Sequence, residues 1–586
     1  MRLLQGCSVH RLRRIVFLFA CWRLLLPVPG ALAQFRVQFG VRIPMRDGVQ
    51  LAADMWLPKE PGRYPAILVR TPYLKTLPLL GTTQLAQTYA SHGYVTVIQD
   101  TRGRGDSDGE FGFFFQEGHD GYDTIEWMAA QPWSNAKVGM MGVSYLGTVQ
   151  WLAAREHPPH LTCIAPTAPA GRYFDEIPYT GGAWGMWWGI NWLNSVQGRI
   201  VQSANSLGID MKEVYEHRPL ATMDEAFGRP NMRFYHEFLE HDTLDAYWKR
   251  IMFSTEDFEK LDIPSLTVTG WFDGDQPGAL FYWRNMRAHS PARDKQYLLI
   301  GPWNHNQTFL GGAAKQGDFE FSADSVYDIK ALRLAFFDHF LKGIPTFDFP
   351  RAKIYVMGSN KWRDEQEYTP AAAQTRSLYF HSQGKANTLG GDGLLSWDAP
   401  KDEPPDHYTY VPENPVSPAE GEDYGADQRY MERREDVLVY TSDKLKDPVE
   451  VIGEVLVHLS AASDARDTDF TARILDVYPD GKALVLGPQM VGIIRARYRK
   501  GYDHTELLTP NKSEQYQIDL NDIGYTFLAG HQIRVEISSS YSPTFSPNSN
   551  TGNPVATDTE SRPAKQTIFH DGARLSYISL PVMPSP

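Results

Sequence analysis

A serine between two glycines is the first candidate for chemistry. Ser144 stands in Gly142-Val143-Ser144-Tyr145-Leu146-Gly147, after a short apolar run at residues 138–141 and before a helix expected at residues 148–156. A strand-to-helix elbow of this kind exposes the serine hydroxyl and aims free backbone N–H groups at developing negative charge. We therefore expect Ser144 to be a nucleophile. The usual elbow has glycine two residues after the serine, where this chain has Leu146, so an ordinary helix start with a capping serine stays open.

A serine nucleophile needs a base, and the base needs a carboxylate that orients it. Asp273 follows a strand-like run at residues 265–269, and His305 follows another at residues 296–300. Open α/β sheets build their sites at the carboxyl ends of such strands. The chain order Ser, Asp, His is that of the α/β-hydrolases. We expect these three residues to form a catalytic triad, with a structural histidine in a Trp-containing loop as the alternative.

Two tyrosines are candidates for an oxyanion hole. The backbone N–H of Tyr145 directly follows the nucleophile and is one natural donor. Tyr73 ends the stretch Val69-Arg70-Thr71-Pro72-Tyr73 after an early strand, where its phenol could be the second donor. A packed loop tyrosine is the alternative for Tyr73.

The elements that must position these residues alternate between short apolar runs and helical spacing from residue 65 to residue 156, which predicts βαβ units and a mostly parallel sheet. Residues 35–58 predict a hairpin, residues 398–427 a long surface loop, and the strand-rich region beyond residue 351 a β-sandwich. The predicted class is α/β, with two further parts. The boundaries are residues 34–172 and 261–346 for an α/β-hydrolase core, 173–260 for an inserted helical cap, and 347–586 for a C-terminal β-sandwich.

Bulk properties exclude several classes of protein. A chain of 586 residues exceeds one ordinary core, and a net charge of −13 argues against nucleic acid as a partner. Cys163, in an apolar stretch, is expected to be a buried thiol. The close histidine pairs lack the cysteine partners of a structural zinc site, so no metal is expected, and serine chemistry requires no cofactor.

The first 33 residues predict a leader for export. Arg11, Arg13 and Arg14 precede an apolar run that ends in small residues, so cleavage is expected after Ala33, with a periplasmic or secreted product. The apolar run is too short for a stable membrane anchor. Lipidation at Cys21 is the minor alternative.

Five stretches together are similar to the cocaine esterase / α-amino acid ester hydrolase family, which is related to the X-Pro dipeptidyl-peptidases. The resemblance extends over nearly the whole chain after the leader. It implies a hydrolase core, a helical cap and a C-terminal jelly roll, with Ser144, Asp273 and His305 as the triad and Tyr73 plus the Tyr145 amide as the oxyanion hole. Gly147 also matches the family. The stretches are Arg70-Thr71-Pro72-Tyr73, Asp100-Thr101-Arg102-Gly103-Arg104-Gly105, Gly142 to Gly147, Gly270-Trp271-Phe272-Asp273-Gly274 and Gly301-Pro302-Trp303-Asn304-His305.

Substrate contacts are less well defined. In the family's amino-ester hydrolases, acidic residues just after the triad aspartate and one in the cap hold the substrate's ammonium group. This chain has Asp275, then Gln276 in place of a second acid, with Asp175 and Glu176 as the cap candidates. An α-amino requirement therefore stays open. Cap tryptophans could line an apolar acyl pocket or could pack the cap's own core. They are Trp184, Trp187, Trp188 and Trp192.

The sequence thus predicts a serine hydrolase that cleaves an ester or amide of a small acyl substrate through an acyl-enzyme. An X-Pro dipeptidyl-peptidase-like exopeptidase is the alternative, and a non-catalytic secreted binding protein is a remote one. The expected partner is a small molecule, and the oligomeric state, a homo-oligomer included, stays open.

Overall fold

The computed structural model describes residues 35–77, 81–203, 208–345, 347–418, 426–487 and 491–584. The predicted leader, its cleavage near Ala33 and the lipidation alternative at Cys21 lie outside these residues. Within them, no helix has the length and apolar character that crossing a membrane requires.

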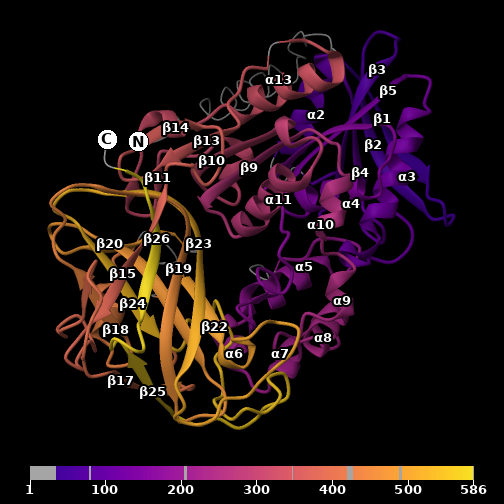
Figure 1. Cartoon of the computed structure of the whole chain (residues 1–586). Coiled ribbons are helices and arrows are strands. Elements are labelled where there is room, and N and C mark those ends of the chain that lie inside the picture. The colour runs from indigo at the N-terminus through magenta and orange to yellow at the C-terminus, as the bar shows by residue number, and fades with distance from the viewer. Residues whose placement is uncertain are drawn as a thin grey trace, which may run out of the picture.

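The first sheet is mixed, with a parallel centre and antiparallel edges (Figure 1). Residues 35–58 form the predicted hairpin, and the following strands pair in parallel from β4 to β13. Short β-branched and apolar runs form its interior strands because both of their faces are buried. The spatial order is β1 (Phe35–Pro44), β2 (Gln50–Pro58), β4 (Val95–Asp100), β3 (Tyr64–Thr71), β5 (Ser134–Val143), β6 (Leu161–Thr167), β9 (Ser265–Phe272), β10 (Gln296–Asn304), β13 (Ala352–Val356) and β14 (Lys361–Glu365).

Helices cover both faces of this sheet (Figure 1). The buried residues of α4 include Val149, Trp151 and Leu152, which pack its inner side against β5 and β6. Cys163 of β6 is fully buried, as expected. The helices around the sheet are α2 (Thr82–Ser91), α3 (Glu117–Ala129), α4 (Tyr145–Arg155), α11 (Gln276–His289), α12 (Gln307–Leu310) and α13 (Ile329–Lys342).

The segment between β6 and β9 is the helical cap. It also holds a two-residue hairpin of β7 (Tyr179–Thr180) and β8 (Ala183–Trp184), which the sequence did not indicate. Short helices make up the rest of its regular structure. Figure 1 shows α6 and α7 beside the strands of the C-terminal part. They are η3 (Trp188–Trp192), α5 (Leu193–Val196), α6 (Met211–Glu216), η5 (Leu220–Thr222), α7 (Met223–Ala226), α8 (Arg233–Glu240), α9 (Ala246–Lys249) and α10 (Thr255–Lys260).

The C-terminal part is the jelly-roll β-sandwich. Its inward faces carry the apolar residues of alternating strand positions, such as Val455 and Val457 of β19 and Val535 of β24, all of them buried in one cluster. The main path is β17 (Asp406–Tyr410), β25 (Ala564–Phe569), β19 (Val449–Ser463), β26 (Tyr577–Val582), β15 (Gln374–His381), β16 (Leu394–Ser396), β18 (Leu438–Ser442), β24 (Gln532–Ser538), β20 (Asp469–Val477) and β21 (Ala483–Val485), with β22 (Val491–Arg495) on β20 and β23 (Glu514–Phe527) on β19.

Two details differ from the sequence-based expectations. The first sheet runs past the predicted boundary at residue 346, because β13 pairs with β10 and β14 pairs with β13. The predicted surface loop at residues 398–427 was wrong in part, since it contains β17, which pairs with β25. In β17 the side chains of Asp406, Tyr408 and Tyr410 are buried. Their alternation is a strand signal that the surrounding prolines and acids obscured.

Candidate active site

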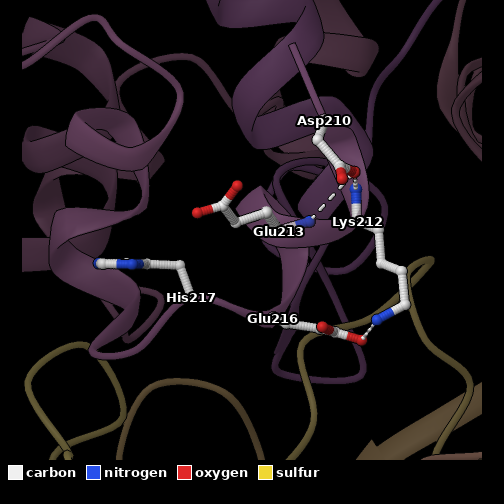
Figure 2. Close-up of a pocket in the computed structure, with 5 residues that line it drawn as sticks. All are labelled: Asp210, Lys212, Glu213, Glu216 and His217. Carbon is white, nitrogen blue, oxygen red and sulfur yellow. Dashed lines mark hydrogen bonds and ion pairs between the residues drawn. The ribbon is translucent and has the colours of Figure 1, made fainter.

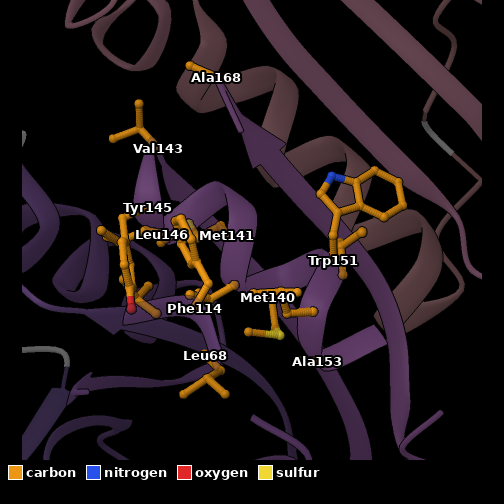
Figure 3. Packing of buried hydrophobic residues seen from close by; sticks show 14 of the residues in the cluster. Leu68, Phe114, Met140, Met141, Val143, Tyr145, Leu146, Trp151, Ala153 and Ala168 are labelled. Carbon is orange, nitrogen blue, oxygen red and sulfur yellow. The ribbon is translucent and has the colours of Figure 1, made fainter. Parts of the chain in front are cut away.

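Ser144 lies in a strained turn between β5 and α4. Its φ of 63° and ψ of −130° are dihedrals that a residue with a side chain rarely adopts. The Ser144 N–H donates to Thr167 O of β6 at 2.9 Å, which ties the turn to the neighbouring strand. Figure 3 shows the apolar side chains packed around this turn, among them Val143 and Leu146. The turn therefore holds the serine backbone in one orientation.

Two glycines make the turn possible. A Cβ on Gly142 would lie 2.4 Å from Leu146 Cβ, and a Cβ on Gly147 would lie 2.6 Å from Thr167 O. A side chain at position 147 would therefore collide with the backbone of β6, which explains why glycine stands there.

His305 and Asp273 lie together at the ends of β10 and β9. Nδ1 of His305 is 2.7 Å from Oδ1 of Asp273, and the other carboxylate oxygen of Asp273 accepts from Thr269 Oγ1 at 2.8 Å. Asp273 is fully buried, whereas 37% of the His305 side chain is exposed. Because Nδ1 faces the carboxylate, Nε2 is the imidazole nitrogen left for a serine or a substrate.

Tyr73 lies beside the serine. Its hydroxyl accepts a hydrogen bond from Trp192 Nε1 at 2.8 Å, and Ser144 is among the groups that lower its pKa. Burial raises the pKa of Tyr73 to about 12, so the phenol keeps its proton near neutral pH. Tyr145 begins α4, where its backbone N–H is one of the free donors of the helix start. Its own hydroxyl points elsewhere, to Phe113 O at 2.8 Å.

Two further carboxylates lie near His305. Oδ2 of Asp275 is 3.9 Å from His305 Nδ1. Glu176, from the start of the cap, accepts backbone N–H groups from Gly171 at 2.9 Å and Gly278 at 3.1 Å. Burial and then the charge of Asp275 raise the pKa of Glu176, and burial with the charge of Asp273 raises the pKa of Asp275, against the opposing effect of His305. A cation placed between the two carboxyls would relieve this cost.

Asp175, the other cap candidate, does not join this pair. Its carboxylate forms an ion pair with Arg172, whose guanidinium also reaches Asp519 of the jelly roll at 3.1 Å. Asp175 therefore already has a cation, and Glu176 is the cap residue that the structure brings toward Asp275.

The cap tryptophans have three different environments. Trp184 is fully buried and packs the cap's core, whereas 60% of Trp187 is exposed. Trp188 stacks on Trp192 with ring centres 4.9 Å apart, and Trp192 stacks on the Tyr145 ring at 6.1 Å. Of the four cap tryptophans considered from the sequence as pocket walls, Trp188 and Trp192 thus adjoin the residues around Ser144. Trp192 does so through its contacts with Tyr145 and Tyr73.

A separate hollow lies at α6 (Figure 2). Charged side chains of α6 and its two ends line it, and none of them is a candidate site residue. They are Asp210, Lys212, Glu213, Glu216 and His217. Among the described residues, no cluster of His, Cys, Asp and Glu side chains is arranged to hold a metal ion.

Comparison with known proteins places this geometry in a family. The X-Pro dipeptidyl-peptidase (S15 family) model matches residues 47–307, and the X-Pro dipeptidyl-peptidase C-terminal non-catalytic domain model matches residues 347–579. The cocaine esterase of Rhodococcus sp. (strain MB1 Bresler) is 33% identical over 582 residues, which cover 94% of this chain and 99% of the relative. The chain belongs to the cocaine esterase family.

Solved structures agree with this assignment over nearly the full length. An aminopeptidase from a marine sediment Thaumarchaeota archaeon superposes with a TM-score of 0.84 at 25% identity, covering 96% of this chain and 99% of that one. An α-amino acid ester hydrolase gives a TM-score of 0.82 at 25% identity, covering 95% and 100%. The protein is thus a serine hydrolase of a family that acts on esters or dipeptides.

In this member of the cocaine esterase family, the surrounding charges change the pKa of His305. Burial lowers the pKa of His305, but the charge and hydrogen bond of Asp273, followed by the charges of Asp275 and Glu176, outweigh burial and raise it to about 9. In the absence of a bound cation the imidazole is therefore mostly protonated near neutral pH. A cation beside Asp275 and Glu176 would lower this pKa and free the imidazole to act as a base.

Sequence reasoning missed three supporting contacts. Thr269 holds the far oxygen of Asp273, Thr167 receives the Ser144 N–H, and Trp192 donates to Tyr73. Thr269 lies close to Asp273 in the sequence, at the end of the same predicted strand, and this position was a usable signal. The other two contacts cross between elements distant in sequence, so spacing alone carries no sign of them.

Proposed function

We propose that Ser144, Asp273 and His305 are the catalytic triad of this hydrolase. Ser144 Oγ attacks the carbonyl carbon of an ester or amide while His305 Nε2 takes its proton, and Asp273 holds the imidazole through Nδ1. The proton then passes to the leaving alcohol or amine, which departs and leaves an acyl-enzyme. Water, activated by the same histidine, hydrolyses the acyl-enzyme and restores the serine.

Tyr73 and the Tyr145 amide supply the oxyanion hole in this proposal. The phenol keeps its proton, since its pKa is raised to about 12, and can donate a hydrogen bond to the tetrahedral oxyanion. The single observation that carries the mechanism is the 2.7 Å contact between His305 Nδ1 and buried Asp273, at the strand ends next to the Ser144 turn.

The preferred substrate is an ester or amide of an α-amino acid, with its ammonium group between Asp275 and Glu176. Both residues are partly accessible, and each carboxyl has a raised pKa that a bound cation would lower again. The stacked rings of Trp188 and Trp192 offer an apolar wall for the acyl side chain.

A dipeptidyl-peptidase activity is the second candidate, because the same carboxylate pair would hold a free peptide N-terminus. The S15 family match and the aminopeptidase structure support it. Turnover of Gly-Pro or Ala-Pro anilides in the absence of activity on simple esters would favour this candidate.

The first experiment compares p-nitrophenyl butyrate turnover by the wild type and Ser144→Ala. We expect the variant to be indistinguishable from buffer, and equal rates would remove Ser144 from the chemistry. The second compares phenylglycine methyl ester with its des-amino counterpart. A preference below about tenfold, or ~1.4 kcal/mol, contradicts the ammonium site.

Export is part of the proposal. The basic and apolar residues of the N-terminal segment support cleavage near Ala33 and a periplasmic or secreted product. N-terminal sequencing of the protein recovered from outside the cytoplasm tests it, since a start at Met1 would contradict cleavage.

A further inference from the structure

Arg104 is a buried guanidinium without an acidic partner. The side chain is fully buried, and among the described residues it forms no salt bridge. Burial lowers its pKa to about 10, so it still carries its charge near neutral pH. Burying an unpaired charge is costly unless hydrogen bonds compensate for it. The hydrogen bonds of Arg104 must therefore offset this cost.

Its hydrogen bonds go to two segments that meet at the oxyanion hole. Nε donates to Pro72 O at 2.7 Å, directly before Tyr73. The two terminal nitrogens donate to Val196 O at 2.8 Å and Ser195 O at 3.1 Å. Those carbonyls end the helical stretch that begins with η3 and carries Trp192. Carbonyls at a helix end lack partners within the helix, and a cation stabilises that end.

One guanidinium thus fixes both partners of the hydrogen bond between Trp192 Nε1 and the Tyr73 hydroxyl. The topology explains how it reaches them. β3 and β4 are parallel neighbours with Thr71 opposite Asp100, so the loops that carry Tyr73 and Arg104 leave the sheet side by side.

The Trp192 bond has a directional consequence. The indole N–H can only donate, so it occupies a lone pair of the Tyr73 oxygen. The phenol proton then points away from the cap, toward Ser144, where the oxyanion forms. Burial raises the pKa of Tyr73, while the hydrogen bond from Trp192, the interaction with Ser144 and the charge of Arg104 act in the opposite direction. The bond from Trp192 and the charge of Arg104 stabilise negative charge on the phenol oxygen, which makes the phenol a stronger hydrogen-bond donor to an oxyanion.

We propose that Arg104 and Trp192 are positioning residues that tie the cap to the oxyanion hole, so that Tyr73 donates correctly only when the cap helix is in place. This inference rests on the proposed function and extends it. It makes the cap part of the catalytic step as well as of substrate binding.

The test measures kcat and KM on p-nitrophenyl butyrate, which has no ammonium group and so is not bound through Asp275 and Glu176. Trp192→Phe keeps a stacked ring and loses the N–H. We expect kcat to fall about tenfold, the upper end of the scale for one hydrogen bond between neutral groups, with KM within about twofold. Trp187→Phe is the matched control, because Trp187 belongs to the same segment of the cap but is 60% exposed, and its kcat should change less than about twofold.

Arg104 is tested by Arg104→Gln and the charge-preserving Arg104→Lys. We expect kcat to fall about 100-fold in the first and about tenfold in the second, because lysine keeps the charge but not the fork that reaches both segments. If Arg104→Gln does not fold, Trp192→Phe still decides the question, because it leaves the buried guanidinium intact.

A double-variant series separates positioning from mere stability. In a Tyr73→Phe background, Trp192→Phe should lower kcat by less than about twofold further, because the hydroxyl it orients is gone. Equal kcat for Trp192→Phe and Trp187→Phe overturns the inference. So does full additivity, in which Trp192→Phe lowers kcat by the same factor in the Tyr73→Phe background as in the wild type. A wild type that neither hydrolyses the ester nor reacts with a fluorophosphonate overturns the proposed function as well, so the two failures are distinct.

Discussion

Ser144, Asp273 and His305 come from the ends of the parallel strands β5, β9 and β10 of one sheet, whereas Glu176 and Trp192 come from the first part of the cap. Strand ends are fixed by the sheet, by buried partners such as Thr269 and by the glycine contacts of the turn. The cap residues instead depend on contacts with each other and with the jelly roll. The sheet therefore positions the residues that carry out catalysis. The packing of core, cap and jelly roll against one another positions the residues that recognise the substrate.

The largest expected effect on activity comes from a change in the triad at the strand ends. Asp273→Asn removes the carboxylate that holds His305 Nδ1, and we expect kcat/KM to fall by about 10⁴-fold for every substrate. Rates on phenylglycine methyl ester and on its des-amino counterpart should fall by the same factor. A loss confined to the aminated ester would show that Asp273 acts in recognition, and the comparison would break.

Gly147→Ala tests the backbone turn that positions Ser144 at the end of its strand. The added methyl would lie 2.6 Å from Thr167 O, so we expect a loss of about 1–3 kcal/mol in the free energy of unfolding and a fall in kcat, as β6 and α4 separate. Denaturant unfolding measures the stability. Gly390→Ala is the control, because its nearest neighbour would lie 3.9 Å away. Equal stability of the two variants would contradict a close-packed turn.

Asp275→Asn tests the residues proposed to bind the substrate's ammonium group. We expect the preference for the aminated ester to fall by about tenfold, while turnover of the des-amino ester changes little at its own pH optimum. Asp175→Asn is the matched control, because Asp175 is paired with Arg172 and should leave the preference unchanged. Identical losses in the two variants would mean that the negative charge acts at long range and not at a defined site.

The same division separates the features that the sequence predicted from those that it did not. The hairpin, the strand ends, the triad order and the helical insertion could be read from apolar runs and chain order, because each is set by local pattern. The environments of the cap residues could not. Trp184 and Trp187 are three residues apart, yet one is fully buried and the other 60% exposed. Asp175 and Glu176 are adjacent, yet only one faces Asp275. Long-range packing decides these differences.

The smallest expected effect is a shift in the pH profile. His305 acts as a base only when neutral, so kcat/KM on a simple ester should rise with pH through its pKa, which the nearby carboxylates raise to about 9. Asp275→Asn removes a charge that favours the protonated imidazole. The rise of kcat/KM with pH should therefore occur at lower pH, by roughly half a unit to one unit. Ser144→Ala supplies the background rate. A rise at unchanged or higher pH would contradict the charge coupling.

The central claim is that the Ser144 hydroxyl carries the acyl group. Acid quenching during turnover of p-nitrophenyl butyrate, followed by peptide mass mapping, measures this directly. We predict a butyryl adduct on the peptide that contains Ser144, which accumulates in Asp273→Asn if deacylation slows more than acylation and is absent from Ser144→Ala. An adduct on any other residue, with Ser144 unmodified, would contradict the account.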